Sequence, residues 1–235
     1  MDVNMFYRFY DPTYLLVIIG AILSIWASSR VQSTFNKYSG YRAMSGMTGA
    51  QVAETILRNK GIYDVKVDRV RGSLTDHYDP RTKTVRLSDT VYNSTSVAAL
   101  GVAAHECGHV IQHHENYLPL NIRSALVPAA NIGSKAGIPI IILGMLLSYN
   151  YTLIQIGIWV FALSVLFQIV TLPVELNASS RALVCLEQYG IVTNEENQMS
   201  RKVLKAAALT YVAAAAAAIL QLLRLILLFG RRNDD

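Results

Sequence analysis

The strongest chemical signal in the chain is a pair of histidines four residues apart, with a glutamate directly after the first. His105, Glu106 and His109 lie in the run from Ala103 to Gln112, which consists mostly of good helix formers. Because residues four apart share one face of a helix, both imidazoles can reach a single Zn²⁺. Glu106 is then placed to take a proton from a zinc-activated water. The spacing therefore predicts a zinc site with hydrolytic chemistry.

This motif is expected inside a buried helix that runs from Ser96 to about His114. Ser96 is a suitable N-cap, and the helix is apolar nearly all round. Three unpaired polar side chains in such a helix would cost about 1–3 kcal/mol each, and a bound metal ion would remove that cost. The competing interpretation is a buried helix whose histidines bond carbonyls or hydroxyls and hold no metal.

A third metal ligand has to come from another part of the chain. His113 lies two turns beyond His105, about 12 Å along a helix, which is too far to share one ion with both motif histidines. Glu175 is the candidate, because it is expected at the start of a second helix with the polar Ser179 one turn later. Glu187, further along that helix, is the reserve. The alternative for Glu175 is a solvated acid that complements the helix dipole.

The composition predicts a membrane protein. Of the 235 residues, 52% are hydrophobic and only 16% are charged, and the mean hydropathy is +0.31, so the chain is more apolar than an ordinary soluble domain. Four stretches are long and apolar enough to cross a bilayer, at residues 12–29, 126–148, 152–172 and 206–230. The expected fold class is mainly α and integral to the membrane, with about four transmembrane helices.

A small α+β region is expected between the first and second spans. Residues 46–61 have the apolar spacing of a helix that Thr48 can cap and Gly61 can end. The pattern then alternates as in strands at 64–70, 73–78 and 83–88, and the last two form a hairpin or two short strands. These elements are too few for an independent core, so they must pack on the motif helix and the membrane helices.

The expected organisation is a succession of five segments. They are an N-terminal segment with the first span (1–29), the α+β region with the motif helix (30–133), spans two and three (134–172), a helical segment that starts at Pro173, carries Glu175 and includes a loop at 190–197 (173–205), and the fourth span with the tail (206–235). This order returns Glu175 to the side of the membrane that holds the motif helix.

Lysine and arginine predict the orientation in the membrane. Residues 30–135 and 173–205 hold seventeen of them, whereas the opposite side holds three, Arg8, Arg231 and Arg232. Cytoplasmic segments carry the excess of basic residues, so we expect the motif on the cytoplasmic side and both termini outside. The formal net charge of +5 then follows from topology, and no nucleic-acid partner is needed. Two cysteines make no disulfide framework, which agrees with a reducing compartment.

Further segments in one order are more specific than the motif alone: Tyr38-Ser39-Gly40 with Met47-Thr48-Gly49-Ala50, Asp76 to Arg81, Val85 to Ser88, Ala103 to Gln112, and Leu172 to Ser179. In these segments the chain resembles the YugP-type membrane zinc metallopeptidases and, more loosely, other integral-membrane gluzincins. The resemblance implies a Zn²⁺ cofactor with His105, His109 and Glu175 as its ligands. It also implies Glu106 as the catalytic base.

The resemblance extends to residues that support the site and bind substrate. In many related membrane gluzincins an Asp stands four residues after the ligand Glu. Ser179 occupies that position here, and Asn177 can share the supporting role. Similarity also implies that the strand before the motif helix pairs with an extended substrate by strand addition, through Thr84, Val85, Arg86 and Leu87.

Together these observations predict a membrane zinc metalloendopeptidase that cleaves a peptide or a membrane-protein substrate, with Glu106 as general base. The sequence does not choose among the candidates for stabilising the oxyanion, which are His77, Tyr78, His113, Arg181 and Tyr189. The alternative is a non-hydrolytic, zinc-containing scaffold or adaptor subunit of a membrane complex. The lipid bilayer is an expected partner in both cases, and an oligomer or a larger complex is compatible with either function.

Overall fold

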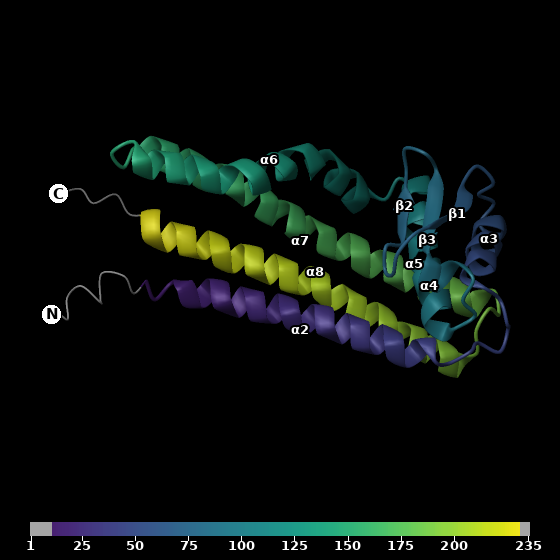
Figure 1. The fold of residues 1–235 in the computed structure, drawn as a ribbon. Helices are drawn as coiled ribbons and strands as arrows, with labels where there is room; N and C mark the ends of the chain where they lie inside the picture. Colours follow the sequence, from purple (N-terminus) through teal and green to yellow (C-terminus); the bar gives the residue numbers. More distant parts are fainter. Residues whose placement is uncertain (1–10, 231–235) are drawn as a thin grey trace. The chain divides into compact units, whose positions relative to one another are not determined.

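The computed structural model describes residues 11–230, most of which lie in α-helices (Figure 1). The chain divides into two compact units. The sheet unit comprises Ala27–Ile122 and Thr171–Thr210, and the helical unit comprises the described residues up to Trp26, Arg123–Val170 and the chain from Tyr211 on. The fold is mainly α with a small three-stranded sheet, as predicted. Three residues of the charge count lie outside the described part: Arg8, Arg231 and Arg232.

Four helices are long and apolar enough to cross a membrane, by length and composition: α2 (Tyr14–Ser39), α6 (Leu118–Leu146), α7 (Tyr151–Gln188) and α8 (Asn194–Phe229) (Figure 1). Each covers most of one predicted span, so the predicted number of membrane-spanning candidates is confirmed. Inside the helical unit, α6 and α7 approach closely where Gly137 has no side chain. A Cβ at that position would lie 3.0 Å from the main chain of Phe161.

These helices continue past the predicted ends of the elements. α2 runs beyond Ser29, and α7 passes through Pro173, where the sequence predicts a new helix. A proline removes one backbone hydrogen bond, but its φ is that of a helix, so the helix can continue. α8 begins inside the predicted loop 190–197 because Thr193 and Glu196 form a capping box. The four predicted segment boundaries between residues 29 and 206 all fall inside helices.

After the end of α2, the sheet unit continues with α3 (Gly49–Asn59), which Thr48 caps as predicted and which Gly61, at φ +70°, follows. The strands β1 (Lys66–Val70), β2 (His77–Asp79) and β3 (Thr84–Ser88) form a sheet in the order β1-β3-β2. β3 pairs parallel with β1 and antiparallel with β2, so β2 and β3 form the hairpin. Two helices follow, α4 (Asp89–Tyr92) and α5 (Val97–His114).

The position of β3 overturns the predicted substrate strand. β3 lies between β1 and β2, so both of its edges are already paired. Thr84, Val85 and Leu87 are buried, and Arg86 is half-buried. Strand addition needs a free edge, because the added peptide bonds to unpaired backbone groups. The prediction that these four residues pair with a substrate is therefore wrong, and the outer edges of this sheet belong to β1 and β2.

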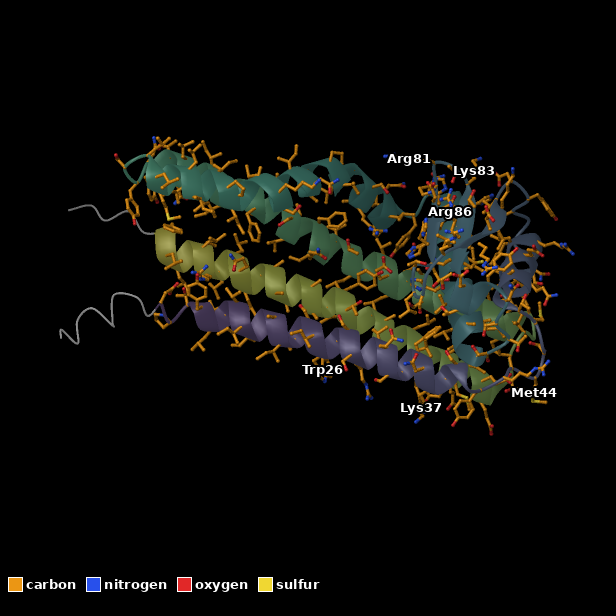
Figure 2. The ribbon with its side chains drawn as sticks, in the orientation of Figure 1. Trp26, Lys37, Met44, Arg81, Lys83 and Arg86 are labelled. Atoms are coloured by element: carbon orange, nitrogen blue, oxygen red, sulfur yellow. The ribbon has the colours of Figure 1, made fainter. Side chains whose placement is uncertain are left out.

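The hairpin turn is held by the carboxylate of Asp79. It accepts hydrogen bonds from Arg86 Nη1 at 3.0 Å and from Thr82 Oγ1 at 2.8 Å. These two bonds hold the pKa of Asp79 well below its usual range. Lys83 has a φ of +48°, the left-handed conformation that tight turns require. Figure 2 shows Arg81, Lys83 and Arg86 gathered at this hairpin.

α5 lies at the centre of the sheet unit. It contacts α3, α4, β2 and β3, and the Oγ of its N-cap Ser96 accepts a backbone hydrogen bond at 3.2 Å. The side chains of Leu100, Ala103, Ala104 and Cys107 are completely buried. The prediction of a buried motif helix is thus confirmed, and its polar residues lie among apolar neighbours.

Candidate metal centre

Three side chains that can bind a metal converge from α5 and α7. The Nε2 atoms of His105 and His109 lie 3.3 Å and 3.5 Å from Oε2 of Glu175, and the ligand atoms of all three residues lie within 4.8 Å of one another. Around a tetrahedral Zn²⁺ with ligand distances of about 2.0–2.1 Å, two ligand atoms are about 3.4 Å apart. Both distances to the carboxylate match that spacing, so this donor set fits a zinc ion.

The helix geometry explains how α5 presents the two histidines. Residues at i and i+4 stack on one face, and here the two rings meet edge to face with centroids 4.8 Å apart. Gly108, between them in sequence, lets α7 approach. A Cβ on Gly108 would overlap the carbonyl oxygen of Ala178 and lie 3.0 Å from its Cα. Glu175 precedes Ala178 by about one turn of α7, so this close crossing brings its carboxylate to the imidazoles.

Gln112 orients the ring of His109. Its Oε1 lies 3.0 Å from His109 Nδ1, while its Nε2 donates to the carbonyl of Val174 at 2.8 Å and to Oδ1 of Asn177 at 2.9 Å. Because both of those partners are acceptors, Oε1 of Gln112 must accept a hydrogen bond from a protonated His109 Nδ1. His109 then keeps the lone pair on Nε2, the atom that faces Glu175, as a metal ligand requires.

His105 has a different partner for its second nitrogen. Its Nδ1 lies 3.1 Å from the hydroxyl of Ser179, which stands one turn after Glu175 on α7. A hydroxyl can donate one hydrogen bond and accept two, so it can serve either tautomer of the ring. The predicted supporting position of Ser179 therefore contacts His105, although its hydroxyl does not by itself decide which nitrogen carries the proton.

Asn177 and Arg181 lie further out than the sequence suggests. Arg181 Nε donates to Oδ1 of Asn177 at 2.7 Å, and its Nη1 donates to Glu115 at 2.5 Å. A chain of polar contacts thus leads from His109 through Gln112 and Asn177 to the Arg181–Glu115 ion pair. Asn177 and Arg181 support the partner of His109 and not the metal ligands themselves. Sequence reasoning missed Gln112, whose signal is a polar residue three positions after His109 in an apolar helix.

Glu106 is buried beside this cluster, with 7% of its surface exposed. Burial raises the pKa of its carboxyl group, and the charges of His105 and His109 oppose that rise. The nearby carboxylates of Asp76 and Glu175 raise the pKa further. Glu106 is thus a stronger base than an exposed glutamate.

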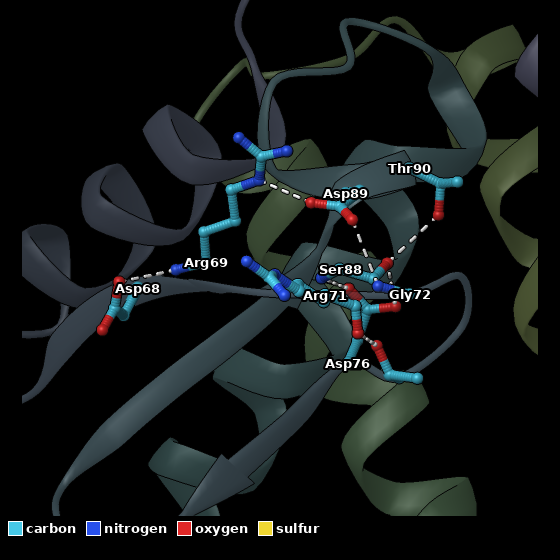
Figure 3. A network of polar contacts seen from close by, with 9 residues as sticks. Asp68, Arg69, Arg71, Gly72, Asp76, Ser88, Asp89 and Thr90 are labelled. Atoms are coloured by element: carbon cyan, nitrogen blue, oxygen red, sulfur yellow. Dashed lines mark hydrogen bonds and ion pairs between the residues drawn. The ribbon is translucent and has the colours of Figure 1, made fainter.

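Asp76 is a part of this setting that sequence reasoning did not assign. It accepts hydrogen bonds from the backbone N of Ser88 at 2.7 Å and from its Oγ at 2.9 Å (Figure 3). Burial raises the pKa of Asp76, although the bonds from Ser88 oppose the rise. These contacts tie the segment before β2 to the end of β3. They also keep a second carboxyl group within electrostatic reach of Glu106.

The remaining sequence candidates have other partners. His113 Nδ1 lies 3.1 Å from the hydroxyl of Tyr78, which joins the end of α5 to β2. His77 is exposed and contacts the carbonyl of Thr75 at 2.9 Å. The two others lie on α7 or just after it: Tyr189 packs against the core, and Glu187 accepts a bond from Asn197 at 3.1 Å. Within residues 11–230, the group of metal-binding side chains contains Glu175 and not Glu187.

Comparison with known proteins places the chain in a family. The family model described as "Putative neutral zinc metallopeptidase" matches residues 13–230. The "Putative membrane protease YugP" of Bacillus subtilis (strain 168) is 46% identical over 223 residues, which cover 94% of this chain and 99% of that protein. No solved structure matches the chain. Since the family model extends over nearly the whole chain, the protein belongs to the family described as "Putative neutral zinc metallopeptidase".

Proposed function

We propose that the protein is a membrane zinc metalloendopeptidase. His105, His109 and Glu175 hold the metal, and Glu106 is the general base. The observation that carries the proposal is the spacing of the two imidazole nitrogens from Glu175 Oε2, 3.3 Å and 3.5 Å, beside a buried glutamate. The hydrogen bonds of Gln112 add to it, because they leave the metal-binding lone pair on His109 Nε2.

The zinc ion, Glu106 and the partners of the two imidazoles have different roles in peptide hydrolysis. A zinc ion bound here would polarise the scissile carbonyl and lower the pKa of a water molecule. Glu106 takes a proton from the attacking water and delivers it to the leaving amine. Burial raises the pKa of Glu106, which strengthens it as a base at neutral pH. Gln112 and Ser179 hold the imidazoles in place while this proton moves.

A substitution of Glu106 tests the proposal. Glu106→Gln keeps the size of the side chain and removes its basicity, so the purified variant should keep its zinc and cleave an unfolded model substrate such as casein about 10²–10⁴ times more slowly. Equal cleavage by the variant would contradict the role of Glu106. A cellular phenotype that survives Glu106→Gln would favour the scaffold or adaptor function instead.

We further propose that an extended substrate adds to the outer edge of β2. β2 contacts α5, and the bond between Tyr78 and His113 holds it against the end of that helix. A photoreactive residue at His77, in the Glu106→Gln background, should crosslink to a bound peptide. The same residue at Arg69, on the other outer strand β1, should not. Equal crosslinking at the two positions would contradict an edge site on β2.

We also propose that the protein lies in the cell membrane with the sheet unit in the cytoplasm and both termini outside. The excess of lysine and arginine in residues 30–135 and 173–205 supports this orientation. Met44 is 83% exposed in the sheet unit, whereas both native cysteines are buried. Met44→Cys should therefore react with an impermeant maleimide only after the cells are opened. Labelling in intact cells would reverse the proposed orientation.

A further inference from the structure

A cavity between α7 and α8 in the sheet unit has no role in the proposed peptidase chemistry. It has a volume of about 220 Å³. One part of its lining is apolar and includes Leu183 and Leu204. Another part is basic, because Arg201 and Lys205 stand one turn apart on α8 and both line the cavity. A cavity of this kind suits a ligand that is anionic at one end and apolar at the other.

The charges of the cavity favour an anion. Arg201 and Lys205 are exposed, and neither forms an ion pair within residues 11–230. The hydroxyls of Ser179 and Ser180 line the same space and can donate hydrogen bonds. One carboxylate, Glu187, also lines the cavity, but it already accepts a bond from Asn197. The lining therefore contains two positively charged side chains and one carboxylate, and that carboxylate already has a hydrogen-bond partner.

The position of the cavity along the two helices favours a lipid as the source of that anion. α8 carries no charged residue from Ala206 to Leu223, directly after Lys205, and α7 carries none from Tyr151 to Val174. The cavity thus begins where two membrane-spanning stretches end. Leu176 and Val184, on its α7 side, are 54% and 55% exposed. Basic residues beside the cytoplasmic ends of transmembrane helices attract anionic headgroups, while apolar side chains at that level suit acyl chains.

We propose that this cavity binds the headgroup of an anionic phospholipid, with Arg201 and Lys205 on the phosphate. Ser179 links the site to the metal centre, because it lines the cavity and also contacts His105 Nδ1. A phosphate that accepts a hydrogen bond from the Ser179 hydroxyl leaves only the lone pairs of Oγ for His105. His105 then carries its proton on Nδ1 and keeps the Nε2 lone pair for the metal. This second step rests on the proposed zinc site; headgroup binding does not.

Native mass spectrometry of the full-length protein in detergent tests headgroup binding. Phosphatidylglycerol should be retained more strongly than zwitterionic phosphatidylcholine. Arg201→Ala and Lys205→Ala should each weaken phosphatidylglycerol binding about fivefold. Lys202→Ala is the matched control, because Lys202 lies on the same helix outside the cavity lining, and it should bind like wild type. Equal losses in all three variants, or equal retention of the two lipids, would overturn the proposal.

Two competitors separate the possible sources of the anion. Millimolar inorganic phosphate should leave most of the phosphatidylglycerol in place, since it makes no apolar contacts. Full displacement of the phosphatidylglycerol would instead show a site for free phosphate and would overturn the proposal of a lipid site. A short acidic peptide should not displace the lipid either, and displacement would show a peptide site.

Zinc release tests the link through Ser179. Zinc should leave the wild-type protein several times more slowly in phosphatidylglycerol nanodiscs than in phosphatidylcholine nanodiscs, and Ser179→Ala should abolish the difference. The same rate in both lipids, with phosphatidylglycerol still bound, would overturn the link. A protein that binds phosphatidylglycerol but never binds zinc would refute the proposed function and leave the headgroup site supported.

Discussion

The two imidazoles of the candidate metal centre are held in contrasting ways. His109 bonds to Gln112, which is completely buried and spends its other two hydrogen bonds on acceptors from α7. His105 bonds to the hydroxyl of Ser179, which lines a cavity. The hydrogen bonds of the buried Gln112 therefore hold His109 in a single tautomer. The tautomer of His105 can instead depend on which molecule occupies the cavity and bonds to Ser179.

Because of this difference, we expect the two candidate ligands His105 and His109 to contribute unequally to zinc affinity. The loss of a completely buried amide is costly, because the buried groups that it bonds lose a hydrogen-bond partner. A hydroxyl beside a cavity can be replaced by water at small cost. Substitutions on the two sides should therefore have unequal effects.

The largest effect is expected where α5 and α7 meet, because both sides depend on that contact. Gly108→Ala would force the helices apart, since a Cβ there overlaps the carbonyl of Ala178. We expect a loss of about 1–3 kcal/mol of stability and most of the bound zinc, measured by thermal unfolding and metal analysis. Gly101→Ala is the matched control, because its Cβ would lie 3.3 Å from the Ser200 side chain, a tight contact that a small shift of Ser200 can relieve without moving a backbone carbonyl. A Gly108 variant as stable as this control would contradict the close crossing.

The second-largest loss of zinc affinity should follow substitution of Gln112, the partner of His109. Gln112→Leu has a similar volume but leaves His109 Nδ1, Asn177 and the Val174 carbonyl without their partner. Zinc affinity, measured by competition with a chelator, should fall about 10–100-fold. Wild-type affinity in this variant would mean that the network does not orient His109.

A smaller effect is expected on the adjustable side. Ser179→Ala removes the hydroxyl that contacts His105 Nδ1, but water in the adjoining cavity can take the place of that hydroxyl. The loss of zinc affinity should stay under about tenfold and below that of Gln112→Leu. A larger loss than for Gln112→Leu would reverse the comparison between the two sides.

The outer end of the His109 network should matter least for zinc. Glu115 forms an ion pair with Arg181, but 48% of its side chain is exposed. Exposed ion pairs contribute about 0–1 kcal/mol, and Arg181 keeps its bond to Asn177 when Glu115 is replaced. Glu115→Gln should therefore change zinc affinity by no more than a few fold. A tenfold loss would show that the ion pair is part of the site.

A pH profile should distinguish the role of Glu106 as a base from the role of the two histidines in binding zinc. The negative charge of Asp76 raises the pKa of Glu106, so Asp76→Asn lowers that pKa. Because Glu106 must be deprotonated to act as a base, the acid limb of kcat/KM should move slightly to lower pH while zinc content stays the same. Asp68→Asn, on the exposed strand β1, is the control and should leave the limb in place. A shift to higher pH in Asp76→Asn would contradict the sign of this interaction.

Features encoded by local spacing could be predicted from the sequence. His105, Glu106 and His109 depend on the period of one helix, and Thr48 and Ser96 cap their helices through neighbouring backbone groups. The four long apolar helices follow from composition and length alone. These predictions need no knowledge of which elements meet in space.

Features that depend on distant contacts could not be predicted in the same way. The order β1-β3-β2 is set by packing, so residues 83–88 looked like a strand without revealing that both edges are paired. The partners of Gln112 lie on α7, far away in sequence. The start of α8 is a different case, because the residue types of the Thr193–Glu196 capping box are visible in the sequence, although residues 190–197 predict a loop.

Metal analysis of purified protein tests the proposed zinc centre most directly. Wild type should hold one zinc ion per chain, and Glu175→Ala should lose it when weak chelator is present, because one of three protein ligands is gone. Glu187→Ala, on the same helix outside the cluster, should keep its zinc. Full zinc occupancy in Glu175→Ala, or loss of zinc in Glu187→Ala alone, would contradict the assignment of Glu175 as the third ligand.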